Sequence, residues 1–236
     1  MLDCTSIHFI GIADGLKPLL ILQALMDNPA FVSSCEGVRI HYITNASEGR
    51  VVSFCQEQGI EVITCDPKTM EAGNGWGSDP FELLVSIGWS YMIPGEFLSR
   101  FSRAAINCHG SLLPDYRGNN TYMHAYAQLA DAYGATIHYM TEKFDDGKII
   151  VQAAHKLYLE ETPLIIHRRI CEMTAQVLPE AMRLALEGYP GTRQTGTARY
   201  FYKIDRFEME RLRQANIEHL RAGEPLELAR HKAWEL

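Results

Sequence analysis

The first half of the chain alternates short apolar runs, rich in β-branched residues, with segments of helical periodicity. Residues 7–12 and 38–44 are predicted strands, whereas residues 18–26 carry apolar side chains at helical spacing, with Pro18 suited to a first helical turn. Strands and helices that alternate with short links predict a parallel sheet with helices on both faces. The predicted fold class is therefore α/β, with a mostly parallel, twisted sheet.

The same patterns predict the remaining elements. Ser47 is expected to cap a helix that runs to Gln58 and is stopped by Gly59. Thr162 is expected to cap a long amphipathic helix that has Pro163 in its first position and a kink or break at Pro179. The loop-like residues 71–80 should lead into a helix before the next strand. The other predicted strands are 60–65, 83–89, 104–109, 135–140 and 148–158, and the other predicted helices are 94–101, 119–134 and 204–223.

Composition excludes several classes of protein. The 236 residues are 47% hydrophobic, enough for one substantial core, and 22 basic against 29 acidic residues give a net charge of −7. An acidic chain is a poor general binder of nucleic acid, which requires a positive surface. We find no window near the roughly 20 apolar residues of a membrane span and no signal peptide, so we expect no membrane partner.

The six cysteines form no CxxC pair and match neither a zinc site nor a disulfide framework. Reduced, mostly buried thiols indicate a cytoplasmic protein. We also find no HxxxH or HxH pair near a carboxylate, so we expect no metal site and disfavour a metal hydrolase.

The stretch INCHGSLLPDYRG, residues 106–118, places an amide and an imidazole at a strand end. Asn107 and His109 are two residues apart and therefore face the same side of the strand, while Cys108 faces the opposite side. Ligands of open parallel sheets bind beyond the carboxyl ends of the strands. Asp145 leaves another strand end, and we expect it to meet the first two if the strands are neighbours.

An amide donor and a protonated imidazole could stabilise the negative charge that grows on an attacked carbonyl oxygen. A nearby carboxylate would hold His109 protonated and could move a proton through a water. These functions suit a primary amine that attacks an acyl donor. The alternatives stay open at this point, because a lone histidine is more often structural and Asp-Asp-Gly is more often an ordinary turn.

Two motifs resemble the signatures of the folate-dependent formyltransferases. NCHGSLLPDYRG is similar to NxHxSLLPxYRG, and IHYMTEKFDDGKIIVQ is similar to an apolar strand followed by (L/F)DxGxI. The preceding LLVSIGWSYMIPGEFL is similar to the segment that closes the pterin pocket, and the likeness spans about two-thirds of the chain. The resemblance implies a Rossmann-like sheet and transfer of a formyl group from the co-substrate N10-formyltetrahydrofolate, without a metal.

The resemblance also implies roles for particular residues. Asn107, His109 and Asp145 match the catalytic asparagine, histidine and aspartate, whereas Asp146 stands where the family has Gly or Thr and is given no role. Gly110 replaces a common proline. Two segments should line the pterin pocket, chiefly with backbone groups: Trp89, Ser90, Tyr91, Met92 and Ile93, and Met140, Thr141, Glu142, Lys143 and Phe144.

The acceptor is inferred from departures from the family. The loop IADGLKP lacks the Gly-Ser-Asn trio of the glycinamide-ribonucleotide enzymes, and the chain is too short and too acidic for the methionyl-tRNA enzymes. The resemblance is strongest to sugar-nucleotide N-formyltransferases, which act on the amino group of a nucleotide-linked dideoxy sugar. We expect Asn120, Tyr122 and His124 to contact the acceptor, Asn120 and His124 as companions on one helix face.

Other functions remain as alternatives. An N-hydroxyornithine-type formyltransferase, a glycinamide-ribonucleotide formyltransferase or a hydrolase could use the same donor, and a folate-binding module would hold it without turnover. Tyr200, Phe201 and Tyr202 could stack on a base or sugar, although a packing strand is the simpler interpretation. We expect a catalytic core over residues 1–190 and a short C-terminal extension with a strand and a charged helix over 191–236, which could pair two copies as a homodimer.

Overall fold

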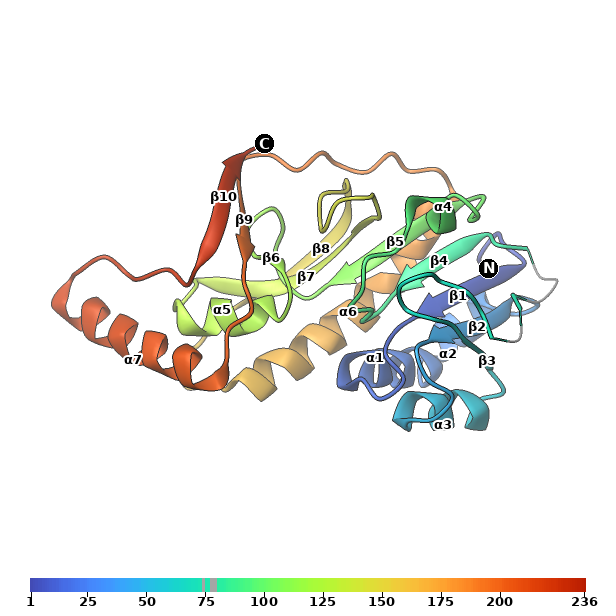
Figure 1. The fold of residues 1–236 in the computed structure, drawn as a ribbon, viewed down its shortest axis with the longest axis horizontal. Coiled ribbons are helices and arrows are strands. Elements are labelled where there is room, and N and C mark those ends of the chain that lie inside the picture. The colour runs from blue at the N-terminus through green and yellow to red at the C-terminus, as the bar shows by residue number, and fades with distance from the viewer. Residues whose placement is uncertain (74, 77–79) are drawn as a thin grey trace.

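The computed structural model describes residues 1–73, 75–76 and 80–236. Its main sheet has seven strands in the order β3-β2-β1-β4-β5-β7-β8 (Figure 1). Strands β1 to β5 are parallel, and β7 and β8 each run antiparallel to the preceding neighbour. The bounds are β1 Ser6–Ile10, β2 Arg39–Thr44, β3 Glu61–Thr64, β4 Leu83–Ser86, β5 Ala104–His109, β7 Ala132–Tyr139 and β8 Ile149–Lys156. This arrangement confirms the predicted α/β fold.

Helices flank the sheet, and α1 packs against the long helix α6. The Thr162 hydroxyl caps α6 by accepting from the Ile165 N–H, and Pro163 takes the first position, as predicted. Pro179 does not break the helix, because buried side chains in the turns on either side hold it against the sheet. The bounds are α1 Leu16–Met26, α2 Pro29–Ser34, α3 Arg50–Glu57, α4 Gly95–Leu98, α5 Thr121–Ala127, α6 Pro163–Leu186 and α7 Arg206–Ala222.

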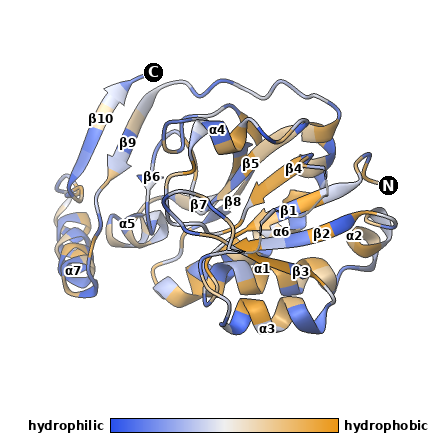
Figure 2. Ribbon diagram, turned by 45° about the vertical axis from the view of Figure 1, so that its right-hand side comes forward, coloured by the Kyte–Doolittle hydropathy of each residue, from blue (hydrophilic) through white to orange (hydrophobic). Residues whose placement is uncertain are grey.

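The largest hydrophobic core lies between the sheet, α1 and α6. Ile7, Phe9 and Leu22 are completely buried in it, together with Leu178 and Met182 of α6. Strands β1 and β4 carry the hydrophobic colours of Figure 2, whereas α7 alternates hydrophobic and hydrophilic residues. Burying this surface supplies most of the driving force for the fold, at about 25 cal/mol per Å².

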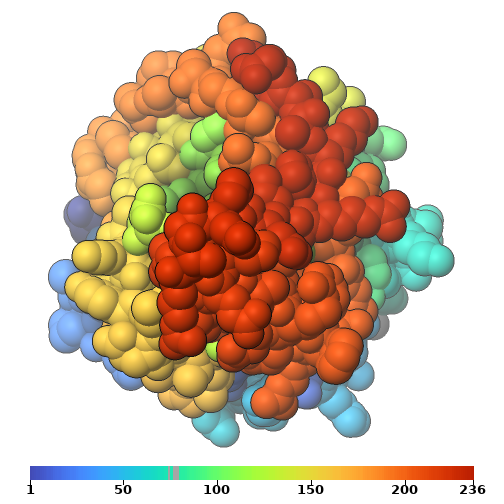
Figure 3. All heavy atoms as spheres, turned by 90° about the vertical axis from the view of Figure 1, so that its left-hand side faces the viewer, coloured from blue at the N-terminus to red at the C-terminus, as the bar shows by residue number. Residues whose placement is uncertain are grey.

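The residues after α6 pack onto the body of the molecule rather than away from it. Strands β6 (Arg117–Gly118), β9 (Thr197–Phe201) and β10 (His231–Glu235) form a second sheet in the order β10-β9-β6. Helix α7 packs on α5, and the two share a second hydrophobic core. Figure 3 shows these C-terminal residues as one continuous face of the molecule.

The predicted helix over residues 119–134 is wrong in its second half. Helix α5 ends at Ala127, and Leu129 has a φ of 50°, so the chain turns back before β7 begins at Ala132. Tyr133 then pairs within the sheet and is buried on the core side. The local spacing suits a helix, but pairing with β8 along the whole strand outweighs a weak helical preference.

Smaller differences also have local causes. Helix α3 starts after Gly49, whose φ is 142°, and among the described residues no side chain caps it, so Ser47 is not the predicted cap. The described residues between positions 71 and 82 are not helical, and the rest of that segment, residues 74 and 77–79, lies outside the described part. The helix predicted over 94–101 is the shorter α4, and strand β10 was not predicted.

Candidate active site

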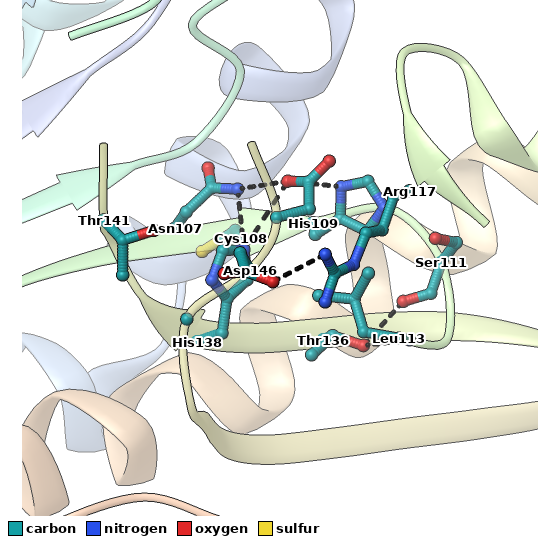
Figure 4. A network of polar contacts seen from close by, with 12 residues as sticks. Asn107, Cys108, His109, Ser111, Leu113, Arg117, Thr136, His138, Thr141 and Asp146 are labelled. Atoms are coloured by element: carbon teal, nitrogen blue, oxygen red, sulfur yellow. Dashed lines mark hydrogen bonds and ion pairs between the residues drawn. The ribbon is translucent and has the colours of Figure 1, made fainter. Parts of the chain in front are cut away.

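Strand β5 presents its last residues to a cavity of about 760 Å³. Asn107 and His109 both line this cavity and leave the strand on the same side (Figure 4). The Cys108 side chain is buried in the main core, although part of the residue also borders the cavity. The alternation expected from the sequence therefore holds, because β5 is regular up to its end.

Asp145 reaches the same point from the turn between β7 and β8. Its Oδ1 lies 3.3 Å from His109 Nδ1 and 3.5 Å from Asn107 Nδ2, and the Gly118 N–H donates to its Oδ2 at 2.9 Å. The strands are neighbours, since β5 pairs directly with β7. The structure thus brings together the three side chains that the sequence singled out.

The turn that carries Asp145 has an unusual backbone. Asp145 has a φ of 51°, in the left-handed region that non-glycine residues seldom adopt. At Gly147 a Cβ atom would collide with the Tyr139 carbonyl, so the turn can close only over glycine. The Asp-Asp-Gly sequence is therefore a turn and, at the same time, part of the site.

His138 is a fourth polar group at this point, and the sequence analysis missed it. Its Nδ1 lies 2.8 Å from the Tyr139 carbonyl oxygen, which can only accept, so Nδ1 carries the hydrogen. Nε2 of the neutral ring then accepts from Asn107 Nδ2 at 3.1 Å. With the second amide hydrogen directed to Asp145, Asn107 must release one of these acceptors before it can donate to a third oxygen.

Asp145 is ionised in this setting. Burial opposes its charge, but the positive charges that His109 and His138 carry when protonated, together with the Gly118 N–H, hold the pKa of the carboxyl well below its usual range. The buried carboxylate therefore has hydrogen-bond donors on both of its oxygens.

His109 differs from the expectation of an imidazole held in its protonated form. Burial lowers its pKa from the usual value of 6.5 and outweighs the opposing effects of Asp145 and the Tyr116 carbonyl. Nε2 lies 2.8 Å from that carbonyl oxygen and so carries the hydrogen. The neutral ring therefore offers Nδ1 as a proton acceptor, 3.3 Å from the carboxylate of Asp145.

The two segments expected to hold the pterin lie along the cavity. Its lining includes Trp89, Ser90, Tyr91, Met92, Ile93, Met140, Thr141, Lys143 and Phe144. Glu142 is the exception within the described part of the chain, because its carboxylate packs over Gly95 instead. Trp89 Nε1 is buried, and no described residue accepts its hydrogen. These features fit a large, partly apolar ligand with a polar edge.

The expected acceptor residues divide into two groups. Asn120 and Tyr122 line the cavity, but His124 is buried in the second core and stacks on Phe201, with ring centroids 4.8 Å apart. Asn120 precedes α5 and has a φ of 53°, so the spacing rule for one helix face does not apply to it. Burial lowers the pKa of His124 to about 4, which also marks it as a packed, neutral side chain.

Three further side chains line the cavity, and the sequence analysis offered only Tyr200 among them as a possible surface for a base or sugar. Lys17, His167 and Tyr200 line it from α1, α6 and β9. His167 lies on the apolar stripe of α6 with Pro163 and Ile170, a pattern that could have revealed it. Tyr200 is the one member of the suggested stacking cluster Tyr200, Phe201 and Tyr202 that lines the cavity, and it reaches the cavity through the pairing of β9 with β6.

The described residues contain no group of three or more His, Cys, Asp or Glu side chains arranged to hold a metal ion. In the described part of the chain, none of the helices combines the length and apolarity that crossing a membrane demands. All six cysteines are free thiols.

Residues 68–182 match the family model described as formyl transferase. A methionyl-tRNA formyltransferase of Geobacillus thermodenitrificans is 32% identical over 245 residues, which cover 94% of this chain and 72% of that protein. The chain belongs to the formyl transferase family. The matched segment contains every catalytic residue proposed from the sequence.

Other members of the formyl transferase family resemble parts of the chain. A GDP-perosamine N-formyltransferase of Brucella melitensis is 32% identical over 130 residues, 54% of this chain and 49% of that protein. The first curated relatives are therefore matched over about half of their length. The crystal structure of glycinamide ribonucleotide transformylase 1 from Symbiobacterium toebii superposes with a TM-score of 0.63 at 23% identity, over 80% of this chain and 93% of that one, and shows the shared fold.

Proposed function

We propose that the chain transfers a formyl group from N10-formyltetrahydrofolate to a primary amine. The observation that carries the proposal is the meeting of Asn107, His109 and Asp145 at one cavity. Membership of the formyl transferase family supports the proposal. The cavity lining by residues 89–93 and by most of residues 140–144, the two segments expected to hold the pterin, supports it as well.

Each side chain then has a chemical task. The folate would supply the formyl carbon, and its N10 would leave with the proton that His109 first takes from the attacking amine and then returns. His109 Nδ1 accepts the proton that the attacking nitrogen loses when the new C–N bond forms. The ionised Asp145 stabilises the resulting imidazolium at 3.3 Å, and Asn107 donates to the formyl oxygen once it has released an internal acceptor.

For the acceptor we propose the amino group of a nucleotide-linked amino dideoxy sugar. Tyr200 and Tyr122 supply flat aromatic surface on the acceptor side, where a sugar ring or base could stack, and Asn120 adds an amide. The likeness to the perosamine enzyme supports this choice. We further propose a cytoplasmic enzyme that pairs two copies through α7, which light scattering would test as a mass of two chains.

The test is release of tetrahydrofolate from N10-formyltetrahydrofolate in the presence of different amines. We expect turnover with a nucleotide-linked amino sugar and much less with glycinamide ribonucleotide, N-hydroxyornithine or methionyl-tRNA. His109→Ala and Asp145→Ala should lower kcat by about a hundredfold or more and change folate affinity little. Tight folate binding without turnover on any amine would instead favour a folate-binding module.

A further inference from the structure

Arg117 is a buried cation beside the turn that carries Asp145. Only 2% of its surface is exposed, and its Nη1 donates to Asp146 Oδ1 at 2.6 Å (Figure 4). The ring of Trp234 in β10 lies 5.3 Å from the guanidinium carbon. A buried guanidinium is costly unless its hydrogens are accepted, so Asp146 has a clear structural reason to be an acid here.

Gln194 joins this arginine to the same turn from the segment that follows α6. Its Oε1 accepts from Arg117 Nη2 at 2.8 Å, and its Nε2 donates to the carbonyls of Asp145 and Gly147, each at 2.8 Å. The amide therefore has a partner for its oxygen and for both of its hydrogens. Thr192, two residues earlier, exchanges both backbone hydrogen bonds with Ile149 at the start of β8.

We propose that Gln194 is a positioning residue that, with Arg117 and Asp146, holds the backbone of the turn so that the Asp145 carboxylate reaches His109 and Asn107. We call these three residues the Gln194 brace. The inference rests on the proposed function only in assigning catalysis to Asp145. The C-terminal segment is then part of the catalytic apparatus, although it supplies no reacting group through the brace.

The backbone of the turn explains why a brace is needed. Asp145 has a φ of 51°, a strained conformation that persists only where neighbouring groups fix it. Gln194 binds the carbonyl of Asp145 itself and that of Gly147, on either side of Asp146. Asp146 holds the intervening residue to Arg117, so three successive residues are tied to one buried cluster.

A small shift of this turn would matter for the reaction. The carboxylate is already 3.3 Å from His109 and 3.5 Å from Asn107, at the outer limit of useful contact. A displacement of about 1 Å in a reacting group can cost about a hundredfold in rate. Loss of the brace should therefore lower kcat and leave the KM of both substrates nearly unchanged.

The test compares Gln194→Ala with Asn216→Ala, which is a matched control. Asn216 is also a buried amide that donates to two carbonyls, those of Ala127 and Glu227, each at 3.0 Å, but it lies away from the cavity. We expect Gln194→Ala to lower kcat by about ten- to a hundredfold, and Asn216→Ala to lower thermal stability with kcat unchanged. Should Gln194→Ala not fold, Gln194→Glu, which can accept from Arg117 but cannot donate, should show the same loss of kcat.

A double-mutant cycle separates positioning from general structure. If Gln194 acts through Asp145, then Gln194→Ala should change kcat by less than about threefold when Asp145 is already Asn. Independent, multiplicative effects of the two substitutions would overturn the inference, and so would a normal kcat in Gln194→Ala.

Hydrogen exchange at Gly118 gives a readout that does not need turnover. Its N–H donates to Asp145 Oδ2 at 2.9 Å, so a displaced Asp145 should speed its exchange in Gln194→Ala by about tenfold or more, but not in Asn216→Ala. Unchanged exchange would contradict the brace whatever amine is used. A wild-type chain without turnover would count against the proposed formyl transfer alone.

Discussion

Asp145 carries the main free-energy costs of the site and also the contacts that offset them. Its carboxylate is buried and its backbone is strained, and both costs are offset by specific partners rather than by solvent. The Gly118 N–H binds one oxygen, while the other faces His109 and Asn107. An anion held in this way is fixed in direction, which suits a group that must stabilise an imidazolium as it forms.

The pH dependence of the reaction should follow His109. Burial lowers its pKa below 6.5, so the neutral, proton-accepting form persists as the pH falls through that value, and activity is lost only at lower pH. We expect the acid limb of kcat/KM to have its midpoint below 6.5. Asp145 acts to raise this pKa, so Asp145→Asn should move the limb of the residual activity further down. A midpoint above 6.5 would show that the proton acceptor is another group or that burial does not dominate.

Gly118 should tolerate no side chain. Its φ is 109°, and a Cβ there would lie 2.7 Å from the Phe201 carbonyl oxygen, so β6 and β9 could not stay in contact. We expect Gly118→Ala to lower the free energy of unfolding by about 2 kcal/mol or more and to reduce kcat, because the donor to Asp145 moves. Chemical denaturation and steady-state kinetics measure the two effects.

Gly223→Ala is the control for backbone strain alone. Gly223 has a φ of 71° at the end of α7, with nothing within 4 Å of the added carbon. The Gly223→Ala variant should lose only about 1 kcal/mol of the free energy of unfolding and should keep its activity. Equal losses of stability in the two variants would mean that the contact with Phe201 is unimportant.

At the scale of elements, the helices and strands that were predicted correctly are those specified by residues close together in the sequence. Strands β1 and β5 and helix α6 with its Thr162 cap follow from apolar periodicity and capping alone. The boundary between α5 and β7 could not be found in this way, because β7 is specified by its partners β5 and β8. Strand β10 is defined in the same manner by pairing with β9.

Helix α7 holds α5 through buried polar contacts as well as apolar ones. Arg213 donates to the carbonyls of Tyr126 and Leu159, each at 2.6 Å, and its guanidinium carbon lies 3.8 Å from the centre of the Tyr126 ring. The C-terminal helix is therefore tied to the end of α5 and to the segment between β8 and α6. The division into a core and an extension at residue 190 stays a prediction.

Arg213→Ala should destabilise the protein strongly. Two carbonyls lose a charged donor and the ring loses its contact, so we expect a fall of about 3 kcal/mol in the free energy of unfolding. Arg211 is the matched control: its guanidinium pairs with Glu208 at 2.8 Å on the exposed side of α7. Arg211→Ala should cost about 0.5 kcal/mol or less. Similar losses in the two variants, measured by urea denaturation, would show that α7 is not held by these buried contacts.

At the scale of the whole molecule, the cavity forms where segments distant in the sequence meet. Asn107 and His109 come from β5, Asp145 from the β7–β8 turn, Lys17 from α1 and Tyr200 from β9. The meeting of Asn107, His109 and Asp145 could be predicted, because these residues lie within two motifs on neighbouring strands. Gln194 could not be predicted, and the sequence could not single out Tyr200 from Phe201 and Tyr202, because only the folding of the C-terminal segment onto β6 and β8 brings both residues to the site.

Tyr200 provides the test of whether that C-terminal segment helps to select the acceptor. Its ring lies against Gly118 and lines the cavity, whereas the exposed Tyr202 on the same strand packs beside Arg230 and lies outside the cavity lining of the described residues. An aromatic face that packs on a sugar or base contributes about 1.5 kcal/mol, or about tenfold in affinity. Tyr200→Ala should therefore raise the KM of the acceptor about tenfold and leave the KM of the folate unchanged. Tyr200→Phe should retain most of the affinity for the acceptor. The control, Tyr202→Ala, should change neither KM. If Tyr200→Ala raised the KM of the folate instead, β9 would border the donor, and the acceptor would have to approach His109 from the side of Lys17 and His167.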